Sequence, residues 1–254
     1  MLDKVSNWLR PQALVSDQSA IWIVDCFQYA IEHFDREEFF NRCQLVQPTN
    51  AFFPGNVSSV EEKAQNIFQH SMRHAGLSHW PFKLNHSGMP IPNAALTSDT
   101  LTIERDSNKT LNQLEAKNSH FTIGYNSQQT LKPEDLAASF AQLFAQYMIF
   151  HAVQLPPRGQ THLMEASEVI SVFMGFGVVL ANSAYTFRGG CGSCFNPSAN
   201  RHASLTENEV LFALAVFCCY KDIANKEATQ HLKKHLRGSF ITARKQAQQL
   251  LSDR

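Results

Sequence analysis

Apolar residues in the first half of the chain follow two different periods. Over residues 20–42 they recur every three to four positions, which predicts a helix. A capping-box pattern, Ser58 with Glu61, predicts the start of a second helix that runs to about His74 and ends before Gly76. Short alternating segments predict strands at 82–84, 101–104 and 121–125, and 43–46 is compatible with a fourth.

The second half of the chain has the pattern of packed helices. Pro133, followed by two acidic residues, predicts a helix start, because acidic side chains complement the positive end of the helix dipole. That helix should run to about Leu155. Further helices are expected at about 164–186, after a capping box formed by Thr206 and Glu209, and over 232–250.

A strand-containing half followed by an all-helical half indicates an α+β fold. We expect a small sheet with N-terminal helices packed on a mainly helical C-terminal half. A chain of 254 residues can bury about 70% of its extended surface, which is enough for one or two cores without disulfide support. The sequence therefore predicts a single domain over 1–254, with an α/β lobe at 1–130 and a helical lobe at 131–254.

The composition argues against several classes of protein. The 22 basic residues balance the 22 acidic ones, which argues against a nucleic-acid binder. The stretches 136–158 and 169–187 carry one charge between them, but both contain polar residues that are costly in lipid, so a buried helix pair is expected rather than a membrane hairpin. Six cysteines are too few for a disulfide scaffold, and no signal-peptide pattern is visible, so we expect a cytoplasmic protein.

Several short motifs occur in a fixed order along residues 45–251. They are a Pro-Thr-x-x-Phe-Phe-Pro segment from Pro48, an uncharged helix led by 136–141, a Val-Phe-Met-Gly-Phe-Gly run at 172–177, an Ala-Asn-Ser-Ala-Tyr run at 181–185 and a Leu-Thr-Glu cap at 205–207. In this order they resemble a group of uncharacterised bacterial proteins related to the gluzincin metallopeptidases. The resemblance implies a zincin-like fold.

The residues that carry metallopeptidase chemistry are replaced at the matching positions. The resemblance implies a helix with an Ala-His-Glu-Leu-Ala-His run, in which two histidines share one zinc ion and the glutamate is the base. Gln142, Leu143 and Gln146 stand at those three positions. The third ligand, a glutamate, matches Met164, and a following aspartate matches Glu168. Carboxamides are weak zinc ligands and leucine cannot move a proton, so we expect a pseudoenzyme with no catalytic residue, metal or other cofactor.

Two interpretations of this vestigial site, which comprises Gln142, Leu143, Gln146, Met164, Glu165 and Glu168, remain open. If the two glutamine amides are buried they need partners, and the two glutamates on the next helix are placed to supply them. Otherwise the glutamines edge the solvent face. If a groove persists beside the helix, an unknown peptide or protein would bind there by strand addition along 120–126.

Two other functions are consistent with the sequence. Cys191 and Cys194 form a CxxC in a glycine-rich, irregular stretch and would make a thiol-redox or metal-binding site. The other is a structural helical interaction domain whose Gln142 face is packed solid. His70 and His74 also have zinc-compatible spacing, but no glutamate follows the first histidine and a basic neighbour would repel a cation, so exposed histidines are expected.

Overall fold

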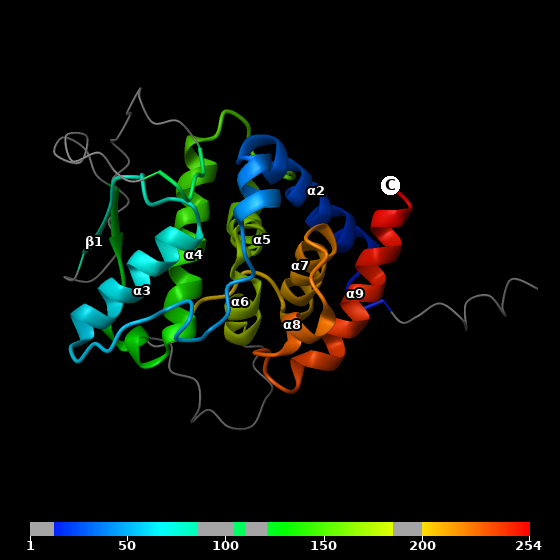
Figure 1. Ribbon diagram of the computed structural model, residues 1–254. Coiled ribbons are helices and arrows are strands. Elements are labelled where there is room, and N and C mark those ends of the chain that lie inside the picture. The colour runs from blue at the N-terminus through cyan, green and yellow to red at the C-terminus, as the bar shows by residue number, and fades with distance from the viewer. Residues whose placement is uncertain (1–12, 86–103, 110–120, 185–199) are drawn as a thin grey trace, which may run out of the picture.

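The helices are arranged in layers on both sides of α4 (Figure 1). The structure is a computed structural model that describes residues 13–85, 104–109, 121–184 and 200–254. Its α-helices are α2 (Asp17–His33), α3 (Val60–His74), α4 (Pro133–His151), α5 (Leu163–Ser171), α6 (Gly177–Ser183), α7 (Glu207–Tyr220), α8 (Asn225–Thr229) and α9 (Leu236–Ser252). Wider π-helical turns are η1 (Glu38–Arg42) and η5 (Val172–Phe176), and 3-10 turns are η3 (Ser127–Leu131) and η4 (Gly159–His162).

The central helix α4 separates the sheet side of the molecule from the helical side. It packs against α3 on one side and against α5 and α6 on the other (Figure 1). Beyond α6, α7 contacts α9, and α2 packs on α5 and α7. The buried face of α4 is apolar along most of its length, which explains how residues 136–150 can lack charged side chains.

A two-stranded parallel sheet confirms the α+β class. The strands β1 (Phe82–Asn85) and β2 (Phe121–Gly124) pair with Phe82 opposite Phe121. Those two rings pack on α4, where Phe82 lies 5.1 Å from Phe144 and Phe121 lies 5.1 Å from Tyr147, measured between ring centroids. The predicted strand at 101–104 falls mainly outside the described residues.

The helix expected over 164–186 is interrupted at its middle. Gly175 has φ of 99°, which a residue with a side chain adopts only under strain, and the chain bends there between α5 and α6. The bend admits the segment 43–46, whose Val46 N–H donates to the Gly175 carbonyl at 2.9 Å. The prediction that 43–46 is a strand is therefore wrong, because the Val46 N–H is bonded to a helix bend and no strand in the described part of the chain pairs with this segment.

Four helix boundaries also differ from the sequence-based expectation. The helix expected to run to about Leu155 ends at His151. The helix expected over 20–42 ends at His33, and Asp35, with φ of 66°, turns the chain before η1. The capping box predicted at Ser58 and Glu61 is instead formed by Ser59 and Glu62, so α3 begins one residue later than predicted. The last helix begins at Leu236, after the separate short helix α8.

One helical stretch in the described part of the chain is long and apolar enough to cross a membrane. It is Gly159–Ser183, and 83% of its most apolar 18-residue window is buried against the rest of the protein. Core helices pass the same test of length and composition, so the burial is the more informative observation.

The close approach at Gly175 yields a test of the helix bend. A Cβ atom at this position would lie 2.2 Å from the Gln44 carbonyl oxygen, in addition to the strain of the positive φ. We expect Gly175→Ala to lower the free energy of unfolding, measured by urea denaturation, by more than about 3 kcal/mol. Gly159 also has a positive φ, but nothing lies within 4 Å of its Cβ position, so Gly159→Ala should cost only about 1 kcal/mol. Equal losses in the two variants would contradict the proposed contact.

Candidate functional site

Two residues of the predicted vestigial site meet across the α4–α5 interface. Gln142 of α4 is 6% exposed and Glu168 of α5 is fully buried. The guanidinium of Arg201 lies between them, and its Nη1 donates to Glu168 Oε1 at 2.7 Å and to Gln142 Oε1 at 3.3 Å. The expectation of a polar cluster is thus met in part, with an arginine as its centre.

Arg201 and Glu168 are both held by further hydrogen bonds. The Arg201 Nε donates to Ser183 Oγ at 3.1 Å, and its backbone N–H donates to Asp135 Oδ2 at 3.0 Å. Glu168 also accepts from the backbone N–H of Ser204 at 2.5 Å and of Leu205 at 3.2 Å. A buried carboxylate with one ion pair and two backbone donors is well satisfied, so it needs no other cation.

Asp135 occupies the far end of the same cluster. Burial raises the pKa of its carboxyl group, and the hydrogen bond from the Arg201 backbone N–H opposes that rise. This carboxyl group sits on the first turn of α4, where the unpaired N–H groups favour a negative charge. The cluster therefore ties the start of α4 to the chain at residue 201.

The other predicted site residues lie outside this cluster. Gln146 is half-buried, and its Nε2 is 3.7 Å from the Met164 sulfur, a weak contact at the surface. Met164 is 49% exposed, Glu165 is half-exposed, and Leu143 packs partly buried against the core. The hypothesis that both glutamines pair with Glu165 and Glu168 is therefore wrong for Gln146 and Glu165. Gln146 of α4 contacts Met164 near the surface, and Glu165 of α5 is partly exposed and lies outside the cluster.

Sequence reasoning missed Arg201, although one signal pointed to it. Glu168 lies between apolar turns of a predicted buried helix, and a buried carboxylate requires a positive partner. The stretch from 169 to 187 offers no basic residue, so the partner had to come from a loop or another helix. Nothing in the local pattern selects Arg201 from the other basic residues.

Asn182, in the run that resembles the family motif, joins three parts of the chain. Its Nδ2 donates to Glu134 Oε2 at 2.8 Å and to the His231 carbonyl at 2.9 Å. Its Oδ1 accepts from the Lys233 N–H at 3.0 Å. The motif 181–185 thus includes one residue, Asn182, that fixes the start of α4 and another, Ser183, that contacts Arg201.

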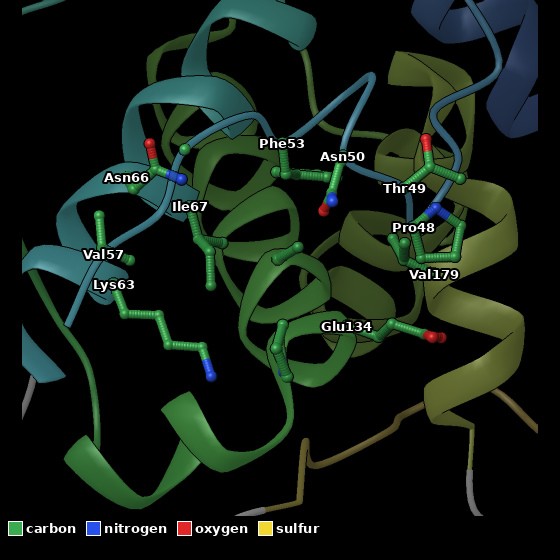
Figure 2. A pocket seen from close by; sticks show the side chains of 13 residues that line it. Pro48, Thr49, Asn50, Phe53, Val57, Lys63, Asn66, Ile67, Glu134 and Val179 are labelled. Carbon is green, nitrogen blue, oxygen red and sulfur yellow. The ribbon is translucent and has the colours of Figure 1, made fainter. Parts of the chain in front are cut away.

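An open cleft lies beside α4, on the side of α3 (Figure 2). Its volume is about 330 Å³, and it is bounded by the segment 48–57, by α3, by the first turns of α4 and by α6. Its walls are mainly apolar, with Phe53, Ile67 and Val179 among them, and Lys63, Asn66 and Asn50 add polar groups. The Phe-Phe-Pro segment of the predicted motif therefore forms one wall of this cleft.

Two histidines hold the 48–57 segment against α3. His74 Nε2 lies 2.8 Å from the Phe52 carbonyl oxygen, and the ring of Phe53 packs at 5.7 Å from His74 and 6.4 Å from His70. Burial lowers the pKa of His74, the hydrogen bond to the Phe52 carbonyl opposes this change, and the charges of His70 and Arg73 add to the lowering. The expectation of exposed histidines is wrong, since both rings are at least partly buried against the segment.

The strand expected to receive a peptide is already in contact with α4. The Tyr147 hydroxyl donates to the Thr122 carbonyl at 3.3 Å, and aromatic rings fill the space between sheet and helix. Cys191 and Cys194 lie outside the described residues. The cysteines that are described are free, and burial raises the pKa of Cys218 to about 12. Among the residues the structure describes, no group of three or more His, Cys, Asp or Glu side chains could hold a metal ion.

The ion pair at the centre of the cluster can be tested by a double-mutant cycle. We expect Arg201→Met and Glu168→Leu each to lower the free energy of unfolding by about 3–5 kcal/mol, since each leaves a buried charge unpaired. The double variant Glu168→Leu/Arg201→Met should lose less than the sum, because no charge is then left buried. The exposed pair of Arg254 with Asp25 is the control, and Arg254→Ala should change stability by less than about 1 kcal/mol. Additive losses at residues 168 and 201 would contradict the pairing.

The lowered pKa of His74 predicts a loss of stability in acid. In the folded chain this pKa lies below its ordinary value of 6.5, so below that pH the unfolded chain takes up a proton that the folded chain does not. The free energy of unfolding should therefore fall as pH falls from 6.5 toward the lowered pKa. Urea denaturation at several pH values should show a shallower fall for His74→Gln, while the exposed His202→Gln should keep the slope of the parent chain. An unchanged slope in His74→Gln would show that other groups cause the loss.

Comparisons with family models, with curated proteins and with solved structures give no match for this chain.

Proposed function

We propose that this chain is a non-catalytic, metallopeptidase-like protein that acts by binding a peptide or another protein. The observation that carries the proposal is the pair formed by Arg201 and Glu168, at the position that the sequence resemblance assigns to the metal-binding helices. A guanidinium provides a positive charge for the carboxylate, as a metal ion would. It accepts no lone pair from water and has no open coordination position, so it cannot generate a hydroxide nucleophile.

The neighbouring side chains support a structural role for this site. Leu143 offers no group that could act as a base, and Gln142 already accepts a hydrogen bond from Arg201. Both members of the ion pair are at most 1% exposed, so a substrate has no access to them. In this proposal the side chains at the former catalytic position have a structural role, because they hold α4, α5 and residues 200–205 together.

Binding is assigned to the cleft beside α3. The vestigial site is filled by Arg201, and the β2 side of α4 is filled by aromatic rings. The cleft of about 330 Å³ is an open concavity with apolar walls and a few polar groups, the composition that ligand sites usually have. The free state of the described cysteines fits the cytoplasmic location proposed from the sequence.

A structural interaction domain without enzymatic ancestry is the second candidate. The packed environment of Gln142 favours it, because a solid α4–α5 interface is what that function requires. The thiol pair Cys191 and Cys194 is a third candidate, and it depends on residues outside the described part of the chain.

Zinc binding by the untagged chain separates the proposal from a working zinc site and from the thiol site. We expect no zinc to remain after purification and dialysis against a weak chelator, as measured by elemental analysis, and no cleavage of a quenched peptide library. One retained zinc per chain that is lost in Glu168→Gln would contradict the proposal. Zinc that is lost in Cys191→Ser/Cys194→Ser, and kept in Glu168→Gln, would instead support the thiol site.

A further inference from the structure

We propose that His70 and His74 form a pH-sensitive contact that holds residues 48–57 against α3 while both rings are neutral, and that protonation of both rings releases this wall of the cleft. The inference goes beyond the proposed function, because it concerns a conformational change of the chain itself and requires no ligand. It rests on contacts between α3 and the segment 48–57, which both lie in the described part of the structure.

The segment 48–57 lies beside α3 and is part of neither a helix nor a strand. Its residues Thr49, Asn50 and Phe53 line the cleft (Figure 2). The backbone hydrogen bonds within the segment close a turn, in which the N–H groups of Phe52 and Phe53 donate to the Thr49 carbonyl at 3.1 and 2.9 Å. These bonds shape the segment but do not attach it to α3, so its attachment depends on other contacts.

The two histidines make such contacts from the side of α3. They lie at i and i+4, on one face of the helix, with ring centroids 6.4 Å apart and an angle of 28° between the ring planes. His74 Nε2 lies 2.8 Å from the Phe52 carbonyl oxygen, and the Pro54 carbonyl acts on His70 as an acceptor. The ring of Phe53 makes a T-shaped contact with both imidazoles. Each histidine therefore joins the segment through one polar and one apolar contact.

Protonation of both rings would place two positive charges in this contact. The bond to the Phe52 carbonyl survives protonation, because the Nε2–H group of His74 donates in either state, so the charge itself must cause the release. Burial disfavours the charged form and lowers the pKa of both rings, and the charge of the exposed Arg73 adds to the lowering. The two charged rings would also repel each other.

No acidic side chain offsets these charges in the part of the chain that the structure describes. No carboxylate there lies within 4 Å of either ring. The segment 48–57 and η3, which also packs on α3, contain no ionisable side chain. The titratable groups on the other parts of the chain beside α3 contact different partners: Glu134 contacts Asn182, Asp135 the Arg201 backbone, His151 the rings of Trp80 and Phe121, and Arg105 the Ala75 carbonyl.

The direction of the pH effect follows from the linkage between protonation and release. A released ring has an ordinary pKa of 6.5, whereas a ring in the contact has a lower one, so below pH 6.5 the released segment binds more protons. The released population should therefore rise as pH falls from 6.5 toward the lowered pKa values, by up to about tenfold per pH unit for each ring that titrates. Two rings give a steeper change with pH than one ring does.

Amide hydrogen exchange of the full chain, corrected for the intrinsic exchange rate, tests the proposal from about pH 7.5 to about pH 5. We expect the protection of the Phe52 and Phe53 amides to fall reversibly with pH, while the amides of α7 and α9 stay protected. The fall should be steepest in the parent chain, up to about tenfold per pH unit in His70→Gln and in His74→Gln, and absent in the double variant. His202→Gln, which removes an exposed histidine, should behave like the parent chain.

The comparison is between slopes, so a variant whose segment is looser at every pH still gives a result. Ring-proton NMR of the same samples should show both histidines titrating below pH 6.5. Protection of residues 48–57 that does not change with pH, an unchanged slope in the double variant, or simultaneous loss of protection in α7 and α9 would overturn the inference. None of these outcomes bears on the proposed function, which the zinc measurement tests separately.

Discussion

The ion pair between Arg201 and Glu168 is the interaction on which the helical half depends. Removing a carboxylate from water is costly, and a buried pair is maintained only where geometry and further hydrogen bonds compensate. Here the carboxylate has a guanidinium and two backbone donors, and the guanidinium reaches two further side chains. The pair therefore specifies how α4, α5 and the chain before α7 fit together, more than it adds to stability.

A second constraint is the packing of residues 43–46 against the bend at Gly175, between α5 and α6. The Gln44 carbonyl lies so close to Gly175 that no side chain fits there, and the positive φ of that glycine breaks the apolar helix. Phe173, just before the break, stacks on Phe39 at 4.3 Å between centroids. The bend, the extended segment and the aromatic contact form one packing unit, which a helix of regular geometry would exclude.

Local sequence patterns predicted most of the helices and strands. The features that they did not predict depend on contacts between residues far apart in the sequence. The start of α4 at Pro133 and the cap at Thr206 follow from residues that touch each other along the chain. The cap at Ser59 was placed one residue early because both Ser58 with Glu61 and Ser59 with Glu62 fit the same pattern. The broken helix at Gly175 depends on a segment about 130 residues earlier, and no local period contains that information.

The candidate site likewise combines features that local sequence indicates with features that depend on long-range contacts. The helical pattern placed Gln142 and Glu168 on neighbouring helices and left open whether the glutamines were buried, and it did not indicate the partner that both residues share in the structure. Arg201 is 33 residues from Glu168 and lies in a stretch expected to be irregular, so only the folded chain identifies it. The lining of the cleft was missed for a similar reason, because its walls come from four segments that are separate in sequence.

The first turn of α4 connects the two polar regions. Glu134 is fixed by Asn182 of α6 and faces the cleft, while its neighbour Asp135 accepts from the Arg201 backbone and belongs to the buried cluster. Because consecutive helical residues point about 100° apart, one turn can serve both regions without sharing a side chain. The hydrogen bonds made by Asn182 and by the Arg201 backbone thereby hold the first turn of α4, and with it one wall of the cleft, in place.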